Sequence, residues 1–278
     1  MYIGAHVSSS GGVSHSVANA LAIGANAFAL FTGSPRSYTR NLFAEEEIAL
    51  FKSALIAADI KIDNILPHNS YLVNLASPKE DIFLKSKLAF KGEIACLNQL
   101  GLTRLNFHPG SAGKGGDRAA AVQQLADNLK ILIDESEHVC LVIENTAGQG
   151  GYLGSSFEEL ARIIELTNRP ERLGVCLDTA HLWAAGYDLR SLDNYRQVMA
   201  DFDRLIGRNF LKGMHINDSS QPFAGHTDRH ASLGEGLLGD SFKWIAQDKY
   251  MHTIPLILET PNLDKWPDEI EWLRQLAN

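Results

Sequence analysis

The stretch GVCLDTAH (residues 174–181) carries the pattern that decides the fold of this 278-residue chain. Its apolar residues run without a polar break, as is typical of a strand that is buried on both faces of a sheet. The run then ends in Asp178 and His181, two side chains that can carry chemistry. Short runs of this kind alternate along the whole chain with longer amphipathic segments, so the sequence predicts an α/β protein.

Eight apolar runs are rich in Ile, Val, Leu and Phe, and each is predicted to form a buried strand. They are residues 2–7, 27–32, 64–68, 104–108, 140–145, 174–178, 212–217 and 254–259. Eight further segments carry apolar residues at the three- and four-residue intervals of an amphipathic helix. They are residues 12–23, 45–57, 79–99, 118–135, 156–166, 192–206, 241–247 and 267–276.

Eight strand–helix units in succession predict a (β/α)8 barrel, the TIM-barrel fold, with parallel strands inside a ring of helices. No linker, low-complexity segment or charge run interrupts the succession, so we expect a single domain over residues 1–278. Apolar residues make up 45% of the chain, which is enough to bury one large core.

Composition also indicates the cellular compartment in which the protein is expected. No apolar run reaches the ~18 residues of a membrane-spanning helix. The first residues lack the basic and apolar regions of a secretory signal. Cys96, Cys140 and Cys176 are odd in number and far apart, which is typical of reduced thiols in a cytosolic protein. We therefore expect a cytoplasmic protein without a membrane partner.

Six consecutive strands are predicted to end in histidine, aspartate or glutamate. In a TIM barrel the carboxyl ends of all strands meet at one rim, where the active sites of such barrels lie. The loop after the seventh strand adds Asp228 and His230, whose side chains point to the same side if the chain is extended there. Nine candidate metal ligands result: His68, His108, Glu144, Asp178, His181, His215, Asp228, His230 and Glu259.

These nine side chains predict a site for more than one metal ion. Imidazole and carboxylate ligands without thiolates suit Zn²⁺ or Mn²⁺, and one zinc uses only three or four protein ligands. Several buried carboxylates would repel one another unless cations lay between them. The net charge of −8 argues at first against a nucleic-acid binder, but bound dications would concentrate positive charge at the rim. Sites with several metal ions suit phosphodiester hydrolysis.

The motifs at these strand ends resemble those of endonuclease IV, the family of apurinic/apyrimidinic DNA-repair endonucleases. The resemblance covers essentially the whole chain. It rests on YIGAHVS (2–8), NFHPGS (106–111), VIENTAGQG (142–150), GVCLDTAH (174–181), AGYDLR (185–190), GMHIND (213–218), DRH (228–230), SLGEG (232–236) and PLILET (255–260).

The resemblance implies that the nine candidates bind three zinc ions, with Mn²⁺ as an alternative at one or more positions. The implied ligand groups are His68, His108 and Glu144 for the first ion; Glu144, Asp178, His215 and Glu259 for the second; and His181, Asp228 and His230 for the third. In this assignment Glu144 bridges two ions.

The family's activity implies base excision repair chemistry for this site. A hydroxide between the first two zinc ions would attack the DNA phosphodiester 5′ to an abasic site. The products would be a 3′-hydroxyl and a 5′-deoxyribose phosphate, and 3′ blocking groups would be removed by the same chemistry. Glu144 and Glu259 would be the catalytic carboxylates, with Glu259 orienting or deprotonating the nucleophile.

Double-stranded DNA with an abasic site is the implied partner, bound by a monomer. The nucleotide must flip out to reach a recessed cluster, and flipping costs least where no base stacks or pairs. Tyr71 and Leu72 are candidates to fill the gap in the duplex, and Arg229 is a candidate phosphate contact. Arg36 matches the arginine that the family inserts into the groove. The preceding residues 33–35, Gly-Ser-Pro, are less polar than in the family pattern, which bears on lesion preference.

Two other functions fit parts of the pattern. Sugar isomerases and epimerases on related barrels use one Glu-Asp-His-Glu set, which Glu144, Asp178, His215 and Glu259 would supply, but the five further candidates would then have no role. A protein that binds abasic DNA or metal without cleavage is the other alternative. Metal content and a nicking assay with a chelator control separate the three.

Overall fold

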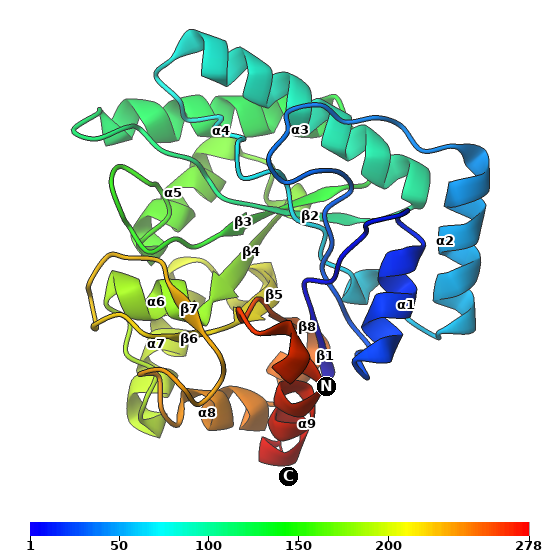
Figure 1. Cartoon of the computed structure of the whole chain (residues 1–278). Coiled ribbons are helices and arrows are strands. Elements are labelled where there is room, and N and C mark those ends of the chain that lie inside the picture. The colour runs from blue at the N-terminus through cyan, green and yellow to red at the C-terminus, as the bar shows by residue number, and fades with distance from the viewer. Residues whose placement is uncertain (278) are drawn as a thin grey trace.

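A computed structural model describes residues 1–277 and shows parallel strands enclosed by helices (Figure 1). Six strands form one sheet in the order β1-β8-β5-β4-β3-β2, and every neighbouring pair is parallel. Their bounds are Tyr2–Ala5 (β1), Arg104–Phe107 (β2), Cys140–Glu144 (β3), Leu173–Asp178 (β4), Leu211–Ile216 (β5) and Pro255–Leu258 (β8). The predicted TIM-barrel-like α/β fold is confirmed.

Two segments close the ring between β1 and β2, although they are not regular strands. Residues 27–30 lie beside β1, and residues 65–68 lie between them and β2. The isolated bridges that join them pair His6 with Ala29, Phe28 with Ile65, and His68 with Asn106. The second and third predicted strands are therefore reduced to short bridging segments. Pro67 contributes to this, because it has no N–H to donate to a neighbouring strand.

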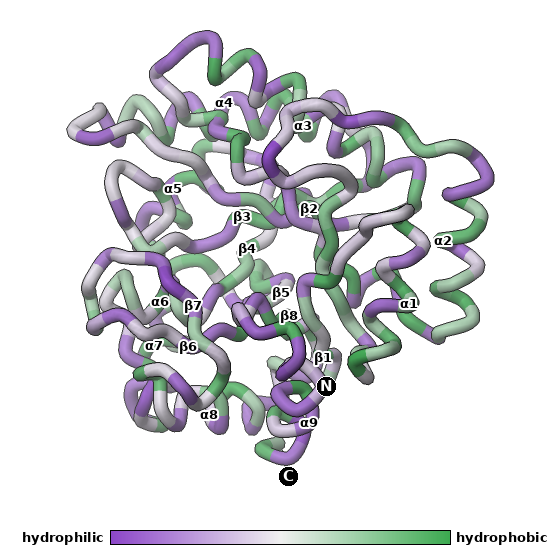
Figure 2. The backbone as a smooth tube through the Cα atoms, viewed as in Figure 1, coloured by the Kyte–Doolittle hydropathy of each residue, from purple (hydrophilic) through white to green (hydrophobic). Residues whose placement is uncertain are grey.

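Helices cover the outside of the ring. Their bounds are His15–Ala22 (α1), Glu45–Ala57 (α2), Glu80–Leu100 (α3), Arg118–Asp134 (α4), Phe157–Thr167 (α5), Thr179–Ala185 (α6), Leu192–Leu205 (α7), Ser241–Gln247 (α8) and Trp266–Leu276 (α9). Hydrophobic and hydrophilic residues alternate along α2 and α3 (Figure 2), as expected of helices with one face on a core. The side chains of Ser156 and Ser191 cap α5 and α7.

Helix α6 and a small hairpin are the elements that the sequence did not predict. α6 is short and almost wholly buried, so it lacks the polar face that marks a surface helix. The hairpin pairs β6 (Asp218–Ser219) with β7 (His230–Ala231) in antiparallel fashion. Both elements lie at the carboxyl end of the barrel, where they place His181 and His230.

The interior of the barrel is apolar in its middle and polar at its carboxyl end. Leu66, Val142 and Cys176 form one fully buried cluster inside the ring. Because side chains alternate along a strand, Glu144 and Asp178 point to the same interior one layer above Val142 and Cys176. The core thus forms a floor beneath a layer of ionisable groups.

The other predictions from composition can be checked in the described residues. Cys96, Cys140 and Cys176 are free cysteines, as expected. No helix within residues 1–277 has both the length and the apolar character needed to cross a lipid bilayer.

Candidate metal centre

The carboxyl ends of the strands bring all nine predicted ligands to one rim. Eight of them form groups in which the possible ligand atoms lie within 4.8 Å of one another. The groups are His68, His108 and Glu144; Glu144, Asp178, His215 and Glu259; and Asp178, His181 and His230; a further group joins Cys176 to Glu144 and His215. The ninth residue, Asp228, contacts His181 and His230. Side chains from residues 68 to 259 therefore meet in one place.

Glu144, at the end of β3, is the centre of the cluster. Its carboxylate is fully buried, and its Oε2 lies 3.2 Å from Nε2 of His68. Its Oε1 lies 3.5 Å from Nε2 of His108 and 3.1 Å from Nδ1 of His215. One carboxylate thus contacts histidines of the first and second groups, as a bridging ligand must.

His215, on β5, connects Glu144 to the two remaining carboxylates of the second group. Its Nδ1 lies 3.2 Å from Oε2 of Glu259 and 3.9 Å from Oδ2 of Asp178. All the atoms of His215 are buried, so these contacts are shielded from water. Asp178 ends β4 and Glu259 follows β8, which places both beside β5 in the sheet order.

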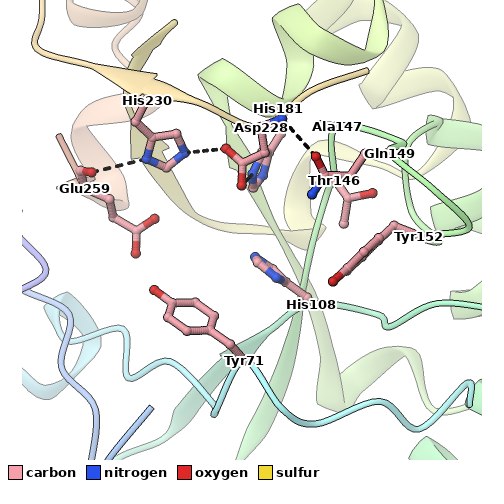
Figure 3. Close-up of a pocket in the computed structure, with 10 residues that line it drawn as sticks. All are labelled: Tyr71, His108, Thr146, Ala147, Gln149, Tyr152, His181, Asp228, His230 and Glu259. Carbon is pink, nitrogen blue, oxygen red and sulfur yellow. Dashed lines mark hydrogen bonds and ion pairs between the residues drawn. The ribbon is translucent and has the colours of Figure 1, made fainter. Parts of the chain in front are cut away.

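Asp228 lies between His181 and His230, the two histidines of the third group, and contacts both. Its Oδ2 is 3.2 Å from Nε2 of His181, and its Oδ1 is 3.2 Å from Nε2 of His230. Figure 3 shows Asp228 beside the His230 ring, above a cavity. His230 also lies 3.7 Å from Oδ2 of Asp178, which links the third group to the second.

Backbone carbonyls fix which ring nitrogen of three histidines faces the cluster. Nδ1 of His68 contacts the carbonyl of Asn69, at 2.7 Å, and Nδ1 of His181 contacts that of Asn145, at 2.9 Å. His230 Nδ1 lies 3.2 Å from the carbonyl of Glu259. A carbonyl only accepts, so each Nδ1 donates its hydrogen and Nε2 turns towards the carboxylates. Two facing acceptors repel unless a proton or a metal ion lies between them.

The distances in the cluster fit shared metal ions, and two of the shortest contacts, His68 Nε2 to Glu144 Oε2 and His215 Nδ1 to Glu144 Oε1, also lie within hydrogen-bond range. Two zinc ligands at about 2.1 Å and a tetrahedral angle lie about 3.4 Å apart. The histidine–carboxylate contacts above are 3.1 to 3.9 Å, whereas His6 Nδ1, outside the cluster, makes a 2.7 Å hydrogen bond to Glu259. His230 Nε2 is buried and makes no hydrogen bond within residues 1–277. The donor set and its spacing therefore suit Zn²⁺.

Asparagines hold the carboxylates of the cluster, and the sequence analysis missed them. Asn106 Nδ2 donates to Oε2 of Glu144 over 2.5 Å, and Asn217 Nδ2 donates to Oδ2 of Asp178 over 2.7 Å. Asn217 also accepts a hydrogen bond from the backbone of Glu259. Asn106 precedes His108 by two residues, so the alternation of a strand was the signal that could have placed it at the site.

The pKa shifts in the cluster indicate that its carboxylates are stabilised by nearby positive charge. Burial alone would raise the pKa of Glu144, but His215 and His108 outweigh it and hold that pKa well below its usual range. Burial would lower the pKa of His230, yet Asp178 and Asp228 raise it to about 9. Glu144 thus stays ionised, and His181, His215 and His230, whose pKa values are all raised, keep protons unless another cation displaces them. A bound dication would take the place of these protons.

A cavity of about 270 Å³ opens onto the cluster (Figure 3). Its lining residues are Tyr71, His108, Thr146, Ala147, Gln149, Tyr152, His181, Asp228, His230 and Glu259. The loop that carries Gln149 and Tyr152 follows β3. This segment contains several glycines without the spacing of a phosphate loop, and it lies at the rim of the cavity.

Comparison with known proteins agrees with this geometry. A family model described as a xylose isomerase-like TIM barrel matches residues 17–276. The crystal structure of endonuclease IV from Thermus thermophilus superposes with a TM-score of 0.84. It is 31% identical in sequence, and the match covers 100% of this chain and 97% of that one. The chain belongs to the endonuclease IV family.

Two further solved structures share the barrel of this endonuclease IV family member. The AsfvAP:AG crystal structure matches with a TM-score of 0.80 at 21% identity, over 100% of this chain and 99% of the other. The apo structure of 3-keto-D-glucoside 4-epimerase from E. coli matches with a TM-score of 0.69 at 14% identity, over 99% of both chains. At these identities the two matches show the fold alone.

The four predicted DNA contacts of this endonuclease IV family member surround the cluster. Tyr71 is 53% exposed and lines the cavity, with its ring 5.5 Å from that of His68. Leu72 is exposed beside it, and Arg36 is exposed on a neighbouring loop. Arg229 is exposed between two candidate ligands, where its Nη1 donates to the carbonyl of Asp228. Tyr71 thus lies at the cavity, whereas the contact of Leu72, Arg36 and Arg229 with DNA stays a prediction.

Proposed function

We propose that this protein is a zinc-dependent AP endonuclease of base excision repair that acts as a single-domain, cytoplasmic monomer. It would hydrolyse the phosphodiester 5′ to an abasic site, leaving a 3′-hydroxyl and a 5′-deoxyribose phosphate, and would remove 3′ blocking groups. The observation that carries the proposal is the set of three ligand groups joined through Glu144 and Asp178 at one rim. A sugar epimerase with one metal ion has no use for the first and third groups.

The residues that would hold the metal ions are the nine that the resemblance implies, and the contacts of Asp228 with His181 and His230 support its place in the third set. The three sets are His68, His108 and Glu144; Glu144, Asp178, His215 and Glu259; and His181, Asp228 and His230. When bound, the ions would act as Lewis acids towards phosphate oxygens and would lower the pKa of water. Asn106 and Asn217 would keep the carboxylates oriented for this binding.

Among the carboxylates of the first two groups, Glu259 is the best placed to orient the attacking water. It lines the cavity, and its side chain is 15% exposed while Glu144 and Asp178 are fully buried. Burial would raise its pKa, but His215 and His6 hold that pKa well below the usual range. Glu259 therefore stays a carboxylate that accepts a hydrogen bond from water. Its two oxygens are held by His6 and His215, which restricts its rotation.

The rim residues would bind the DNA around the flipped nucleotide. Tyr71 and Leu72 are exposed apolar surfaces that would fill the gap left in the duplex, because stacking on an exposed ring replaces lost base stacking. Arg36 and Arg229 would contact phosphates or the groove from two sides of the cavity. A cavity of about 270 Å³ is small for a ligand site and favours a sugar phosphate that carries no base.

The test is a nicking assay on a duplex oligonucleotide that contains one synthetic abasic residue, combined with elemental analysis of the protein. We expect cleavage on the 5′ side of the lesion, loss of cleavage with a chelator, its return with Zn²⁺, and about three zinc ions per chain. A duplex without the lesion is the control. Epimerisation of a sugar with a single metal ion per chain would contradict the proposal. So would stable retention of uncut duplex by the metal-loaded protein.

A further inference from the structure

An ion pair is buried beneath the loop that carries Arg36, away from the metal cluster. Arg40 lies at the end of this loop and Glu93 lies on α3. The Arg40 side chain is 2% exposed and that of Glu93 is fully buried, and Arg40 Nε donates to Oε2 of Glu93. Neither residue touches the cavity, so the reaction does not explain why two charges are buried here.

The ion pair is hydrogen-bonded to the backbone of the loop. Nη1 of Arg40 donates to the carbonyls of Ser34, Ser37 and Thr39, at 3.3, 3.1 and 2.9 Å. Glu93 accepts a 2.5 Å hydrogen bond from Oγ1 of Thr32, where the loop begins. The pair therefore ties the start, the middle and the end of the loop to one point on α3.

Further contacts from α3 continue this attachment. Sγ of Cys96 lies 3.4 Å from the carbonyl of Asn41. The amide of Gln99 accepts from the backbone N–H of Phe43, at 2.8 Å, and donates to its carbonyl, at 3.3 Å. Glu93, Cys96 and Gln99 are spaced by three residues and so share one face of the helix. This face holds a segment that has no regular secondary structure of its own.

The loop in turn holds the second DNA-facing segment. The carbonyl of Pro35 accepts hydrogen bonds from Oγ of Ser70, at 2.8 Å, and from the backbone N–H of Tyr71, at 3.1 Å. The hydroxyl of Tyr38 donates to the carbonyl of Leu72, at 2.9 Å. Arg36 lies in the chain between these two attachments. One buried ion pair thus supports the backbone around Arg36, Tyr71 and Leu72.

We propose that Arg40 and Glu93 are positioning residues for the recognition of abasic DNA, an inference that rests on the proposed function. A buried ion pair is seldom more stable than two apolar side chains of the same size, so its role is better sought in the conformation that it selects. Here that conformation is the loop that presents Arg36. The pair orders this loop before DNA binds, which removes the entropic cost of ordering it on binding.

The test compares Arg40→Met, Glu93→Met and the double variant with the unaltered protein. We expect the single variants to lower the melting temperature and the double variant to recover most of it. We expect all three to bind an abasic duplex about tenfold more weakly, the factor expected when two or three side chains must be ordered on binding. Zinc content and kcat at saturating DNA should stay unchanged.

Two further variants separate positioning from general destabilisation. Arg208→Met removes an ion pair with Asp248 at the amino end of the barrel, so it should lower the melting temperature without changing the affinity for DNA. In an Arg36→Ala background, Arg40→Met should cost clearly less affinity than in the unaltered protein, because it acts partly through Arg36.

The possible results distinguish failure of this inference from failure of the proposed function. Unchanged affinity in the apolar double variant, or fully additive losses with Arg36→Ala, would overturn this inference alone. Failure of the unaltered protein to bind an abasic duplex would overturn the proposed function, and this inference with it.

Discussion

The metal cluster and the loops around it are built in opposite ways. The cluster is buried, and each of its groups contacts several others; Glu144 alone lies within 3.5 Å of His68, His108, His181 and His215. The loops present exposed side chains, such as Arg36 and Tyr71, that are held mainly through their backbones. Under the proposed function, the chemistry would depend on an interlocked set of charges, whereas recognition would depend on exposed side chains that can be changed one at a time.

The largest effect is expected from Glu144→Gln, which removes the carboxylate shared by two ligand groups. Nicking of abasic DNA should fall by more than about ten-thousandfold, because the variant should bind fewer metal ions. Bound metal ions lower the free energy of the charged transition state by several kcal/mol. Elemental analysis and single-turnover nicking check this. Glu269→Gln is the control, since Glu269 is also buried but contacts Thr260 and the backbone of Leu233 instead of the cluster. Full activity of the Glu144 variant would remove the cluster from the mechanism.

Glu259→Gln should separate catalysis from binding at the edge of the cluster. We expect turnover to fall by about a hundredfold to ten-thousandfold, the usual contribution of a general base, while affinity for abasic DNA is kept. Gel-shift and single-turnover assays measure the two quantities. Glu235→Gln, at an exposed glutamate that pairs with Lys265, should change neither. A matching loss of affinity would place Glu259 in binding instead of catalysis.

Arg36→Ala and Tyr71→Ala test the loops. Each should weaken binding of the abasic duplex about tenfold, the usual cost of losing a stacking or charged contact, with hydrolysis from the bound state changed only slightly. Titration of a fluorescent duplex gives the dissociation constant, and saturating kinetics give kcat. Arg162→Ala, on the outer face of α5, is the matched control. A loss confined to kcat would contradict the division between loops and cluster.

The pH dependence of stability should change sign when metal binds. In chelator-treated protein the pKa of His230 is raised to about 9 from an ordinary 6.5, so its stabilising effect is complete below pH 6.5 and is lost as pH rises to about 9. The free energy of unfolding should fall over this range by up to about 3 kcal/mol. Added Zn²⁺ should stabilise more as pH rises, because ligands must be deprotonated. Urea unfolding at several pH values measures both trends, and parallel trends would argue against these ligands.

The smallest expected effect is on the salt dependence of DNA binding. Replacing Arg229 with Ala should reduce the slope of log affinity against log salt concentration by about one, if Arg229 contacts one phosphate. Binding isotherms at several salt concentrations give the slope. The unaltered protein should itself bind more weakly as salt rises, and a flat response would count against a DNA-binding rim.

Most helix bounds and the candidate ligands could be predicted from the sequence, because both depend on patterns among neighbouring residues. α2 and α8 have the predicted bounds because their apolar residues recur with helical spacing. Glu144 and Asp178 stood out because a strand buried on both faces tolerates a charge only at its end. The family resemblance then assigned them to zinc, and Asp228 took its expected place between His181 and His230.

Sequence alone determined a ring of strand–helix units with ionisable groups at one end, since periodicity and strand endings are properties of neighbouring residues. Tertiary structure decided the rest. It reduced residues 27–30 and 65–68 to bridges, set Asn106 against Glu144, and buried Arg40 against Glu93. These contacts join residues about 20 to 50 positions apart, and no local pattern specifies them. Only the packing of the whole barrel fixes which polar groups lose water together and must therefore bind one another.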